Sequence, residues 1–388
     1  MPKVPEEWGN NFYKSGWKPG VDINDQTGQG EITHVGTDPN YNNKFDEILR
    51  QWGYDPKLYE IEGTVRSSSW QVQLKGGRTE TFFAFKGLVK KKRPGQDKYF
   101  QALFKQAGRK PPLKFKTHGG DTAFLFFMAD WQLGKKDYGV ENTIKRYDIA
   151  LQDAVNRIKE LRKSGVLIDE IYMIGLGDLT ENCYGFYDSQ PFNIELSMIE
   201  QYALARSMMM KTIETFLPHA DKLTLAGCPG NHGEASRSQK GQVVTNRLDN
   251  TDTMHLQICE EIMKSNPERY KNVSVKIPDG FHQVMDIKGI TCGWTHGHMT
   301  SGSGNPENKI ENWWKGQMYG FLPAGECQIL ITGHYHHFRA KQQGDRTWFQ
   351  SPSLDKSLDF TARSGMWSHP GVLTFTVNKK GWDNLKIL

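Results

Sequence analysis

Five segments of the chain end in residues that can hold divalent metal ions. In chain order these are Asp130 and Gln132, then Asp178, then Asn231 and His232, then His296, and last His334 and His336. Each group directly follows a short apolar run, which is typical of a strand buried in a parallel sheet. Ligands bind at the carboxyl ends of such strands in open α/β sheets. One such motif is a weak signal, but five in this order predict a metal site.

The residue types indicate which chemistry this site could perform. Asp, Asn, Gln and His without Cys favour Mn²⁺, Fe, Zn²⁺ or Ni²⁺ over Ca²⁺. Two divalent ions about 3.5–4 Å apart can hold both the attacking and the leaving oxygen of an in-line phosphoryl displacement. Such a site needs a carboxylate that bridges the ions and a nearby histidine that is not a ligand. The sequence therefore predicts phosphoryl chemistry at a two-ion centre.

Alternating strand and helix patterns must position these residues. From residue 122 onward, apolar runs at 122–128, 170–176, 222–226 and 327–332 read as strands, and 283–294 as a hairpin. Helical patterns cover residues 142–163, 193–216, 253–264 and 307–319. This order predicts a layered α/β sandwich over residues 118–388. Residues 1–117 predict a small α+β accessory domain, with a helix near 43–52 and a meander of strands between 59 and 89.

Positive charge is concentrated in the first part of the chain. Residues 1–117 contain 20 Lys and Arg against 13 Asp and Glu, whereas the remainder contains 29 against 31. Between residues 86 and 116 the basic side chains are interleaved with Tyr99, Phe100, Phe104 and Phe115. This pattern suits phosphate contacts and base stacking on nucleic acid. A linker helix whose aromatic residues pack inward is the alternative interpretation.

Several classes of protein are disfavoured. The chain has no run of eighteen apolar residues and no apolar core of a signal peptide near its start. Its five cysteines are widely spread and form no Cys-x-x-Cys motif, which argues for a reducing compartment. We therefore expect a cytoplasmic protein without a membrane partner.

The order of motifs D-x-[H/Q], G-D-x-x-E, G-N-H, H-G-H and G-H-x-H resembles the calcineurin-like metallophosphoesterase superfamily over about residues 120–360. The resemblance implies a four-layer αββα sandwich. Motif by motif, it implies that one ion is held by Asp130, Gln132 and His336, and that Asp178 bridges the two ions. It implies that Asn231, His296 and His334 hold the other ion. His232 would be the catalytic histidine, and a hydroxide bridging the ions would attack phosphorus.

Within that superfamily, residues 129–134 and 348–354 are similar to segments of the Mre11/SbcD-type nucleases, and phage-encoded phosphoesterases are a second comparison. This similarity implies a nuclease acting on DNA, and whether it is an exonuclease or an endonuclease stays open. The alternative function is a phosphatase or phosphodiesterase for a small phosphorylated molecule such as a nucleotide. A DNA-binding scaffold with a degenerate site is disfavoured because the ligand residues are intact. A homodimer is implied by analogy alone, and a partner ATPase and the polarity of cleavage stay open.

Two positions depart from the pattern. Gln132 stands where those nucleases usually have a histidine, and a neutral amide oxygen is a weaker ligand than imidazole for such metals. We therefore expect a loosely held ion there and a preference for Mn²⁺. Gly233 is inserted before Glu234, so the usual structural role of that acidic residue is in question.

Some residues near the motifs have two interpretations each. His298 could bind a substrate phosphate or cap a turn, and Arg237 could contact a phosphate or form a surface salt bridge. Glu181 is expected to orient a neighbouring ligand. The aromatic residues of segment 182–188 could stack on a base or belong to a packed loop.

Overall fold

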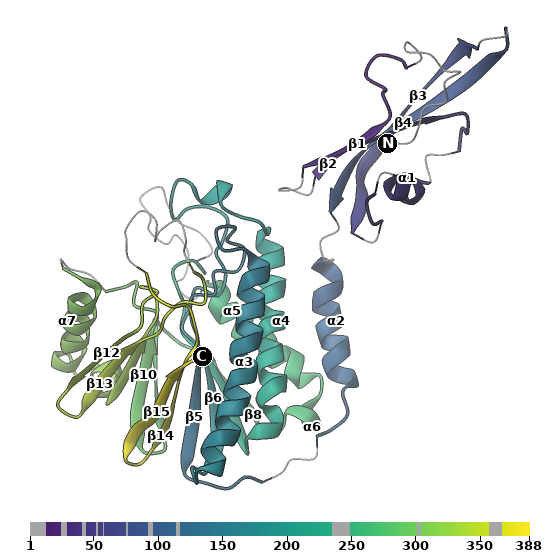
Figure 1. The fold of residues 1–388 in the computed structure, drawn as a ribbon. Helices are drawn as coiled ribbons and strands as arrows, with labels where there is room; N and C mark the ends of the chain where they lie inside the picture. The colour runs from purple at the N-terminus through teal and green to yellow at the C-terminus, as the bar shows by residue number, and fades with distance from the viewer. Residues whose placement is uncertain are drawn as a thin grey trace. The chain divides into compact units, whose positions relative to one another are not determined.

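The computed structural model describes residues 13–24, 29–40, 44–51, 53–56, 58–74, 77–91, 96–113, 117–234, 249–300, 304–356 and 367–388. The chain forms two compact units, Met1–Asp97 and Lys98–Leu388 (Figure 1). The division falls twenty residues before the expected boundary at 117/118. Most of helix α2 (Gln96–Arg109) belongs to the second unit, in whose core Ala107 is buried.

The first unit is a four-stranded antiparallel sheet with one helix, in agreement with an α+β domain. Its strands lie in the order β1 (Gly20–Asn24), β2 (Gln29–Gly36), β4 (Thr79–Lys91) and β3 (Tyr59–Gln73). Helix α1 (Phe45–Gln51) buries Phe45, Ile48 and Leu49 in a cluster with residues of the sheet. A smaller cluster forms around Phe82 and includes Val35 and Ala84.

The second unit is built on a six-stranded sheet. Its strands lie in the order β15 (Gly381–Ile387), β14 (Leu373–Asn378), β5 (Thr122–Met128), β6 (Ile168–Gly175), β7 (Lys222–Gly227) and β8 (Val273–Lys276). Strands β5 to β8 are parallel, and β14 runs antiparallel beside β5. Every residue of β5 is buried because Phe124 and Phe126 belong to one core cluster and Leu125 and Phe127 to another. A strand covered on both faces therefore reads as a continuous apolar run.

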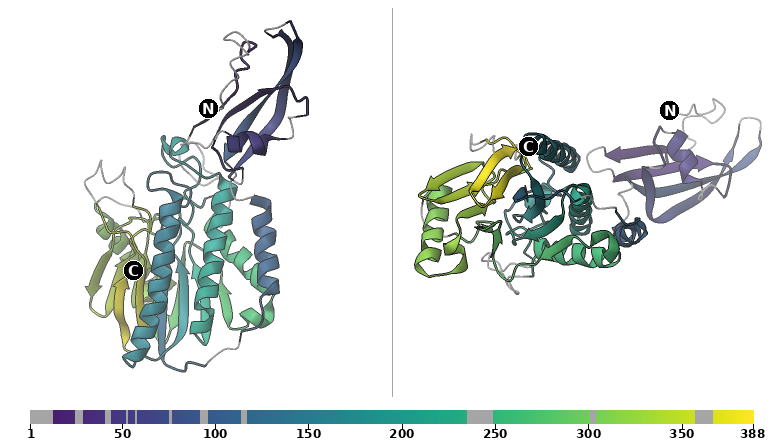
Figure 2. Two further views of the ribbon diagram at one scale, coloured as in Figure 1. Left: turned by 45° about the vertical axis from the view of Figure 1, so that its right-hand side comes forward. Right: turned by 90° about the horizontal axis from the view of Figure 1, so that it is seen from below.

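Helices cover one face of this sheet (Figures 1 and 2). They are α3 (Val140–Lys163), α4 (Met198–Phe216), α5 (Thr251–Lys264) and the short α6 (Pro267–Tyr270), with 3-10 turns at Gln190–Phe192 and Leu217–His219. The ring of Tyr147 on α3 makes edge contacts with Trp131 at 4.7 Å and with Phe126 at 6.2 Å between centroids. These contacts fix the loop after β5, which carries Asp130 and Gln132, against a rigid helix.

A five-stranded sheet shares a core with the other face. Its order is β12 (Arg339–Gln343), β13 (Arg346–Gln350), β11 (Ile329–Thr332), β10 (Ile290–Thr295) and β9 (His282–Ile287). Trp294, Ile331 and Phe349 pack in this core with residues of β5 and β14. Helix α7 (Pro306–Tyr319), followed by a 3-10 turn at Pro323–Glu326, buries Ile310 and Trp314 against a separate cluster of the same sheet.

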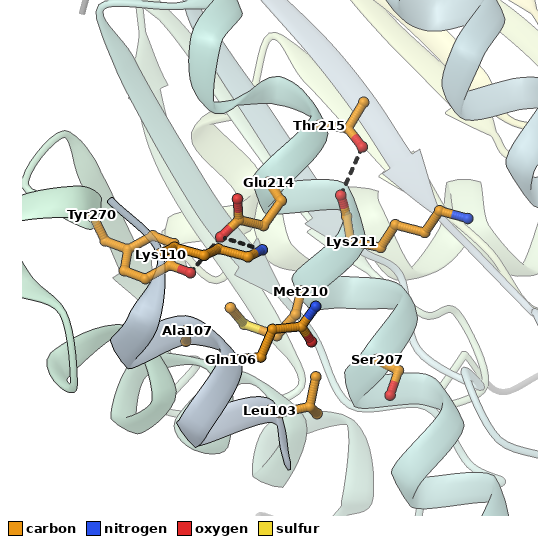
Figure 3. Close-up of a pocket in the computed structure, with 10 residues that line it drawn as sticks. All are labelled: Leu103, Gln106, Ala107, Lys110, Ser207, Met210, Lys211, Glu214, Thr215 and Tyr270. Carbon is orange, nitrogen blue, oxygen red and sulfur yellow. Dashed lines mark hydrogen bonds and ion pairs between the residues drawn. The ribbon is translucent and has the colours of Figure 1, made fainter. Parts of the chain in front are cut away.

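The end of helix α2 is attached to α4 and to the N-cap residue of α6, Asn266, whose Nδ2 donates to Ala107 O at 2.9 Å. Lys110 Nζ lies 3.0 Å from Glu214 Oε1, which also accepts a hydrogen bond from the hydroxyl of Tyr270 (Figure 3). Leu103 and Phe104 of α2 pack against the helical core. The helices line an open pocket of about 510 Å³ beside these contacts (Figure 3). Part of the basic, aromatic segment therefore serves to attach α2.

The structure also describes the cysteines and the apolar character of the helices. All five cysteines are free. Within the described ranges, no helix combines the length and the apolar character needed to cross a membrane.

The core contact of β5 gives a first prediction. Replacing the fully buried Phe126 with Ala should lower the free energy of unfolding by about 3–5 kcal/mol, because it removes apolar contacts and leaves a cavity. Ile149→Ala on α3 is the control, because that side chain is 63% exposed and should change stability by less than about 0.5 kcal/mol. Chemical denaturation of both variants tests this, and equal midpoints would contradict the packing described above.

Candidate metal centre

The predicted ligands lie on loops at the carboxyl ends of strands. Asp130 and Gln132 follow β5, Asp178 follows β6, and the remaining loops follow β7, β10 and β11. Parallel pairing within each sheet brings the loops of that sheet to one end. Two hydrogen bonds connect the sheets there: His334 N donates to Asp130 Oδ2 at 3.1 Å, and His296 Nδ1 donates to Leu176 O at 2.7 Å.

The backbone of these loops is strained. Nine non-glycine residues in the described part of the chain have positive φ, and five of them are predicted ligands: Asp130 (47°), Gln132 (43°), Asp178 (55°), His334 (71°) and His336 (59°). The left-handed region is unfavourable for residues with a Cβ and persists only where the surroundings enforce it. Its concentration at one end of the sheets marks a functional site.

Four predicted ligands converge on one point. The ligand atoms of Asp178, His296 and His334 all lie within 4.8 Å of one another. His296 Nε2 is 2.9 Å from Asp178 Oδ2 and 3.2 Å from His334 Nδ1. Asn231 Oδ1 lies 3.1 Å from the same nitrogen. Because Nδ1 of His296 donates to a backbone carbonyl, its Nε2 is presented to the cluster, as in metal-ligating histidines.

The charged groups of this cluster shift one another's pKa values. Burial disfavours a charged His296, but the Asp178 carboxylate outweighs this effect and raises the pKa of His296 to about 9. Burial and the adjacent His296 lower the pKa of His334 to about 2. Burial also opposes ionisation of Asp178, yet the neighbouring histidines hold the pKa of its carboxyl well below the usual range. The cluster is therefore built around a carboxylate that attracts positive charge.

A second group lies beside it. His336 Nε2 is 3.3 Å from Asp130 Oδ1 and 3.3 Å from Gln132 Nε2. Asp130 is fully buried, and its Oδ1 accepts no well-aligned hydrogen bond from the described residues. The Gln132 amide oxygen, however, accepts a hydrogen bond from Lys135 Nζ at 3.1 Å.

Both groups contain side chains that can bind a cation, but only the first directs all of its donor atoms to one point. Asp178, Asn231, His296 and His334 supply one carboxylate, one amide oxygen and two imidazoles to a single point, which is a donor set suited to a divalent transition metal. Around Asp130 and His336, a buried carboxylate oxygen and an imidazole nitrogen 3.3 Å apart suit a cation, although the Gln132 oxygen is directed elsewhere.

His232 lies next to the cluster with a different set of contacts. Its backbone N donates to Asp178 Oδ1 at 2.8 Å, and its Nδ1 donates to Glu181 O at 2.8 Å. The Glu181 carboxylate is 3.5 Å from the same ring nitrogen. Since Nδ1 is occupied, Nε2 is the nitrogen that can exchange a proton with a substrate.

The segment after Glu181 packs onto this histidine. Phe186 stacks on the His232 ring with 4.4 Å between centroids and an angle of 8° between the planes. The Tyr187 hydroxyl donates to Glu181 Oε1 at 2.6 Å, and Gln190 Nε2 donates to Glu181 O at 2.8 Å. This part of the segment is thus a packed loop that holds His232, whereas Tyr184 is 67% exposed.

The sequence reasoning missed Asp252, which holds two of the loops together. Its Oδ2 accepts hydrogen bonds from Asp178 N (3.0 Å) and Gly230 N (2.9 Å), and its Oδ1 accepts one from Leu179 N (3.1 Å). Asn250 Nδ2 donates to Gly230 O at 2.7 Å. Burial and the nearby Asp178 raise the pKa of Asp252 to about 6. The only sequence signal is an Asn-Thr-Asp run before an apolar helix, which reads as an ordinary helix cap.

Two of the remaining candidate residues, His298 and Glu234, lie next to the cluster. The buried side chain of His298 lies beside the cluster, with its ring centroid 5.3 Å from that of His296 and 6.2 Å from that of His334. Glu234 Oε1 is 3.9 Å from His298 Nε2, so the insertion of Gly233 still leaves Glu234 buried next to the site. Arg237 lies outside the described residues.

A scan of the sequence against family models and a search of curated proteins found no match. One similar solved structure is an archaeal phosphodiesterase, at 13% identity over 68% of this chain and 99% of that chain, with a TM-score of 0.30. Another is Vps29 of Entamoeba histolytica with Zn²⁺, at 10% identity over 68% of this chain and 98% of that chain, with a TM-score of 0.28. A predicted phosphoesterase of Streptococcus pneumoniae is similar at 11% identity, over 67% of this chain and 86% of that chain, with a TM-score of 0.27. These values are low, and the geometry of the site carries the argument for function below.

The role of Asp252 gives a second prediction. Asp252→Ala should lower the free energy of unfolding by at least about 2–3 kcal/mol, because three buried N–H groups lose a charged acceptor. Glu260→Ala on the same helix is the control, since that carboxylate forms a solvent-exposed pair with Lys264. Thermal unfolding of both variants measures the difference. Equal losses would show that Asp252 does no more than an ordinary helix residue.

Proposed function

We propose that this chain is a metal-dependent phosphodiesterase and that its substrate is DNA. One observation carries the proposal: four candidate ligands from four strand ends converge beside a histidine that is fixed through Nδ1 and keeps Nε2 for a substrate. Structural ion-pair networks do not need such a histidine. A phosphoryl-transfer site does, because the leaving oxygen must receive a proton.

In this proposal each residue keeps the role expected from its motif. Asp178 would lie between the two ions, and Asn231, His296 and His334 would hold the ion of the compact cluster. The other ion would be held by Asp130 and His336. Gln132 would be its third ligand, although the Gln132 oxygen faces Lys135 in the structure. Divalent ions bound there supply charge neutralisation and a water of lowered pKa. His232 would stabilise or protonate the leaving oxygen, and Asp252 would keep the Asp178 and Gly230 loops in register.

The finer expectations from the resemblance belong to this proposal too. They are a four-layer αββα arrangement, a preference for Mn²⁺ over Fe, Zn²⁺ or Ni²⁺, kinship with the Mre11/SbcD-type or phage enzymes, and a homodimer. His298 would contact the substrate phosphate, because its ring adjoins both His296 and His334. Arg237 is proposed for the same role from its sequence position alone.

The choice of DNA rests on charge, and one observation favours the alternative. The excess of basic residues before residue 117 suits a polyanion. However, Lys110 is paired with Glu214, and Leu103 and Phe104 pack inward, so part of the basic segment already has a structural use. That use favours a small phosphorylated substrate such as a nucleotide as the second candidate.

A third prediction tests the chemistry. In the presence of Mn²⁺, His232→Ala should reduce hydrolysis of bis-p-nitrophenyl phosphate by roughly 10²- to 10⁴-fold, the usual contribution of a positioned acid. His369→Ala is the control, because that exposed histidine lies outside every motif. Steady-state rates of both variants decide the matter. Undiminished turnover by the His232 variant would remove this histidine from the reaction.

A fourth prediction separates the two substrates. If DNA is the substrate, its binding should weaken steeply with salt, and replacing the four basic residues 90–93 with Gln should flatten that dependence. Fluorescence anisotropy with single- and double-stranded DNA at several salt concentrations measures both effects. Turnover of the small diester without any DNA binding at low salt would instead establish the second candidate.

A further inference from the structure

Lys135 is a buried cation inside the candidate centre that no motif explains. It lies three residues after Gln132, and its side chain is 14% exposed. Its Nζ is 2.8 Å from Asp355 Oδ2 and 3.1 Å from Gln132 Oε1. Asp355, in the segment after β13, is itself only 3% exposed. The ammonium is therefore held in place from both sides.

This contact fixes the orientation of the Gln132 amide. An ammonium group donates hydrogen bonds and cannot accept them, so it must face the oxygen of the amide and not its nitrogen. Gln132 Nε2 then faces His336, at 3.3 Å from its Nε2. Turning the amide to direct its oxygen at a cation would place the NH₂ group against Lys135, which is a donor facing a donor.

The two ion positions are unequal as a consequence. Asp178, His296 and His334 already lie within 4.8 Å of one another, with Asn231 Oδ1 beside them. The other position has Asp130 and His336, a Gln132 oxygen engaged by Lys135, and a fixed positive charge close by. Because Asp355 neutralises the Lys135 charge, the engagement of the Gln132 oxygen is what disfavours a second divalent ion: the position lacks one ligand.

We propose that Lys135 is a positioning residue that makes the two metal positions unequal, by holding the Gln132 oxygen away from the ion that Asp130 and His336 would bind. This inference rests on the proposed function, in which both positions take divalent ions. The protein then binds one ion tightly at the compact cluster and a second ion weakly.

The test is isothermal titration of the metal-stripped full chain with MnCl₂. The wild-type protein should bind two ions in two distinct steps. The double variant Lys135→Met/Asp355→Asn removes the buried pair without leaving an unpaired charge, which limits its cost in stability. It should strengthen only the weaker step, by roughly 10- to 100-fold, the usual effect of a partner behind a metal ligand. Lys136→Met is the matched control, because it removes the same charge from the exposed neighbouring residue.

A second variant keeps the test independent of that pair. Gln132→His should also strengthen the weaker step, because imidazole offers a metal ligand that needs no amide oxygen. Two equal steps in the wild type, or an unchanged weaker step in a folded Lys135→Met/Asp355→Asn variant, would overturn the inference while leaving the phosphodiesterase proposal intact. Failure of every protein to bind Mn²⁺ at all would overturn the proposed function and this inference together.

Discussion

The carboxylate of Asp252 is the interaction on which the arrangement of the site depends. It accepts three hydrogen bonds from backbone N–H groups of two loops that are separated by about fifty residues, and no water is needed to satisfy those donors. A buried charge is costly unless such bonds surround it. Asp178 and the Gly230 loop are thus fixed relative to each other before any cation binds, which is what a preorganised metal centre requires.

The placement of most candidate residues could be predicted from the sequence, because parallel strands buried on both faces read as apolar runs that stop where the sheet ends. Strand β5 coincides with the expected 122–128, and the polar residues after it lie at the site. What the sequence could not reveal are partners distant along the chain. Asp252 bonds a residue 74 positions earlier, and Asp355 meets a lysine 220 positions earlier, and no local pattern encodes either contact.

The first unit was less predictable for a related reason. Strands β1 and β2 contain Gly and polar residues with little alternation. They are held because β1 pairs with β2 and β2 pairs with β4, so nothing local marks them as strands. The meander expected between residues 59 and 89 is instead a pair of long strands, and β3 continues through the irregularity between Glu62 and Arg66. The inward packing of Leu103 on α2 likewise depends on the α4 surface, which lies a hundred residues further along the chain.

The left-handed backbone at five candidate ligands has a consequence for how this protein tolerates change. Each such residue costs roughly 1 kcal/mol or more relative to a relaxed conformation. Glycine has no such cost at the same φ. A library selected only for folding, without regard to catalysis, should therefore enrich glycine most readily at His334 and least at Asp130 and Asp178, whose carboxylates accept hydrogen bonds from the backbone N–H groups of His334 and His232. Stability data alone could then locate the site, because there the native amino acid lowers the free energy of unfolding relative to glycine.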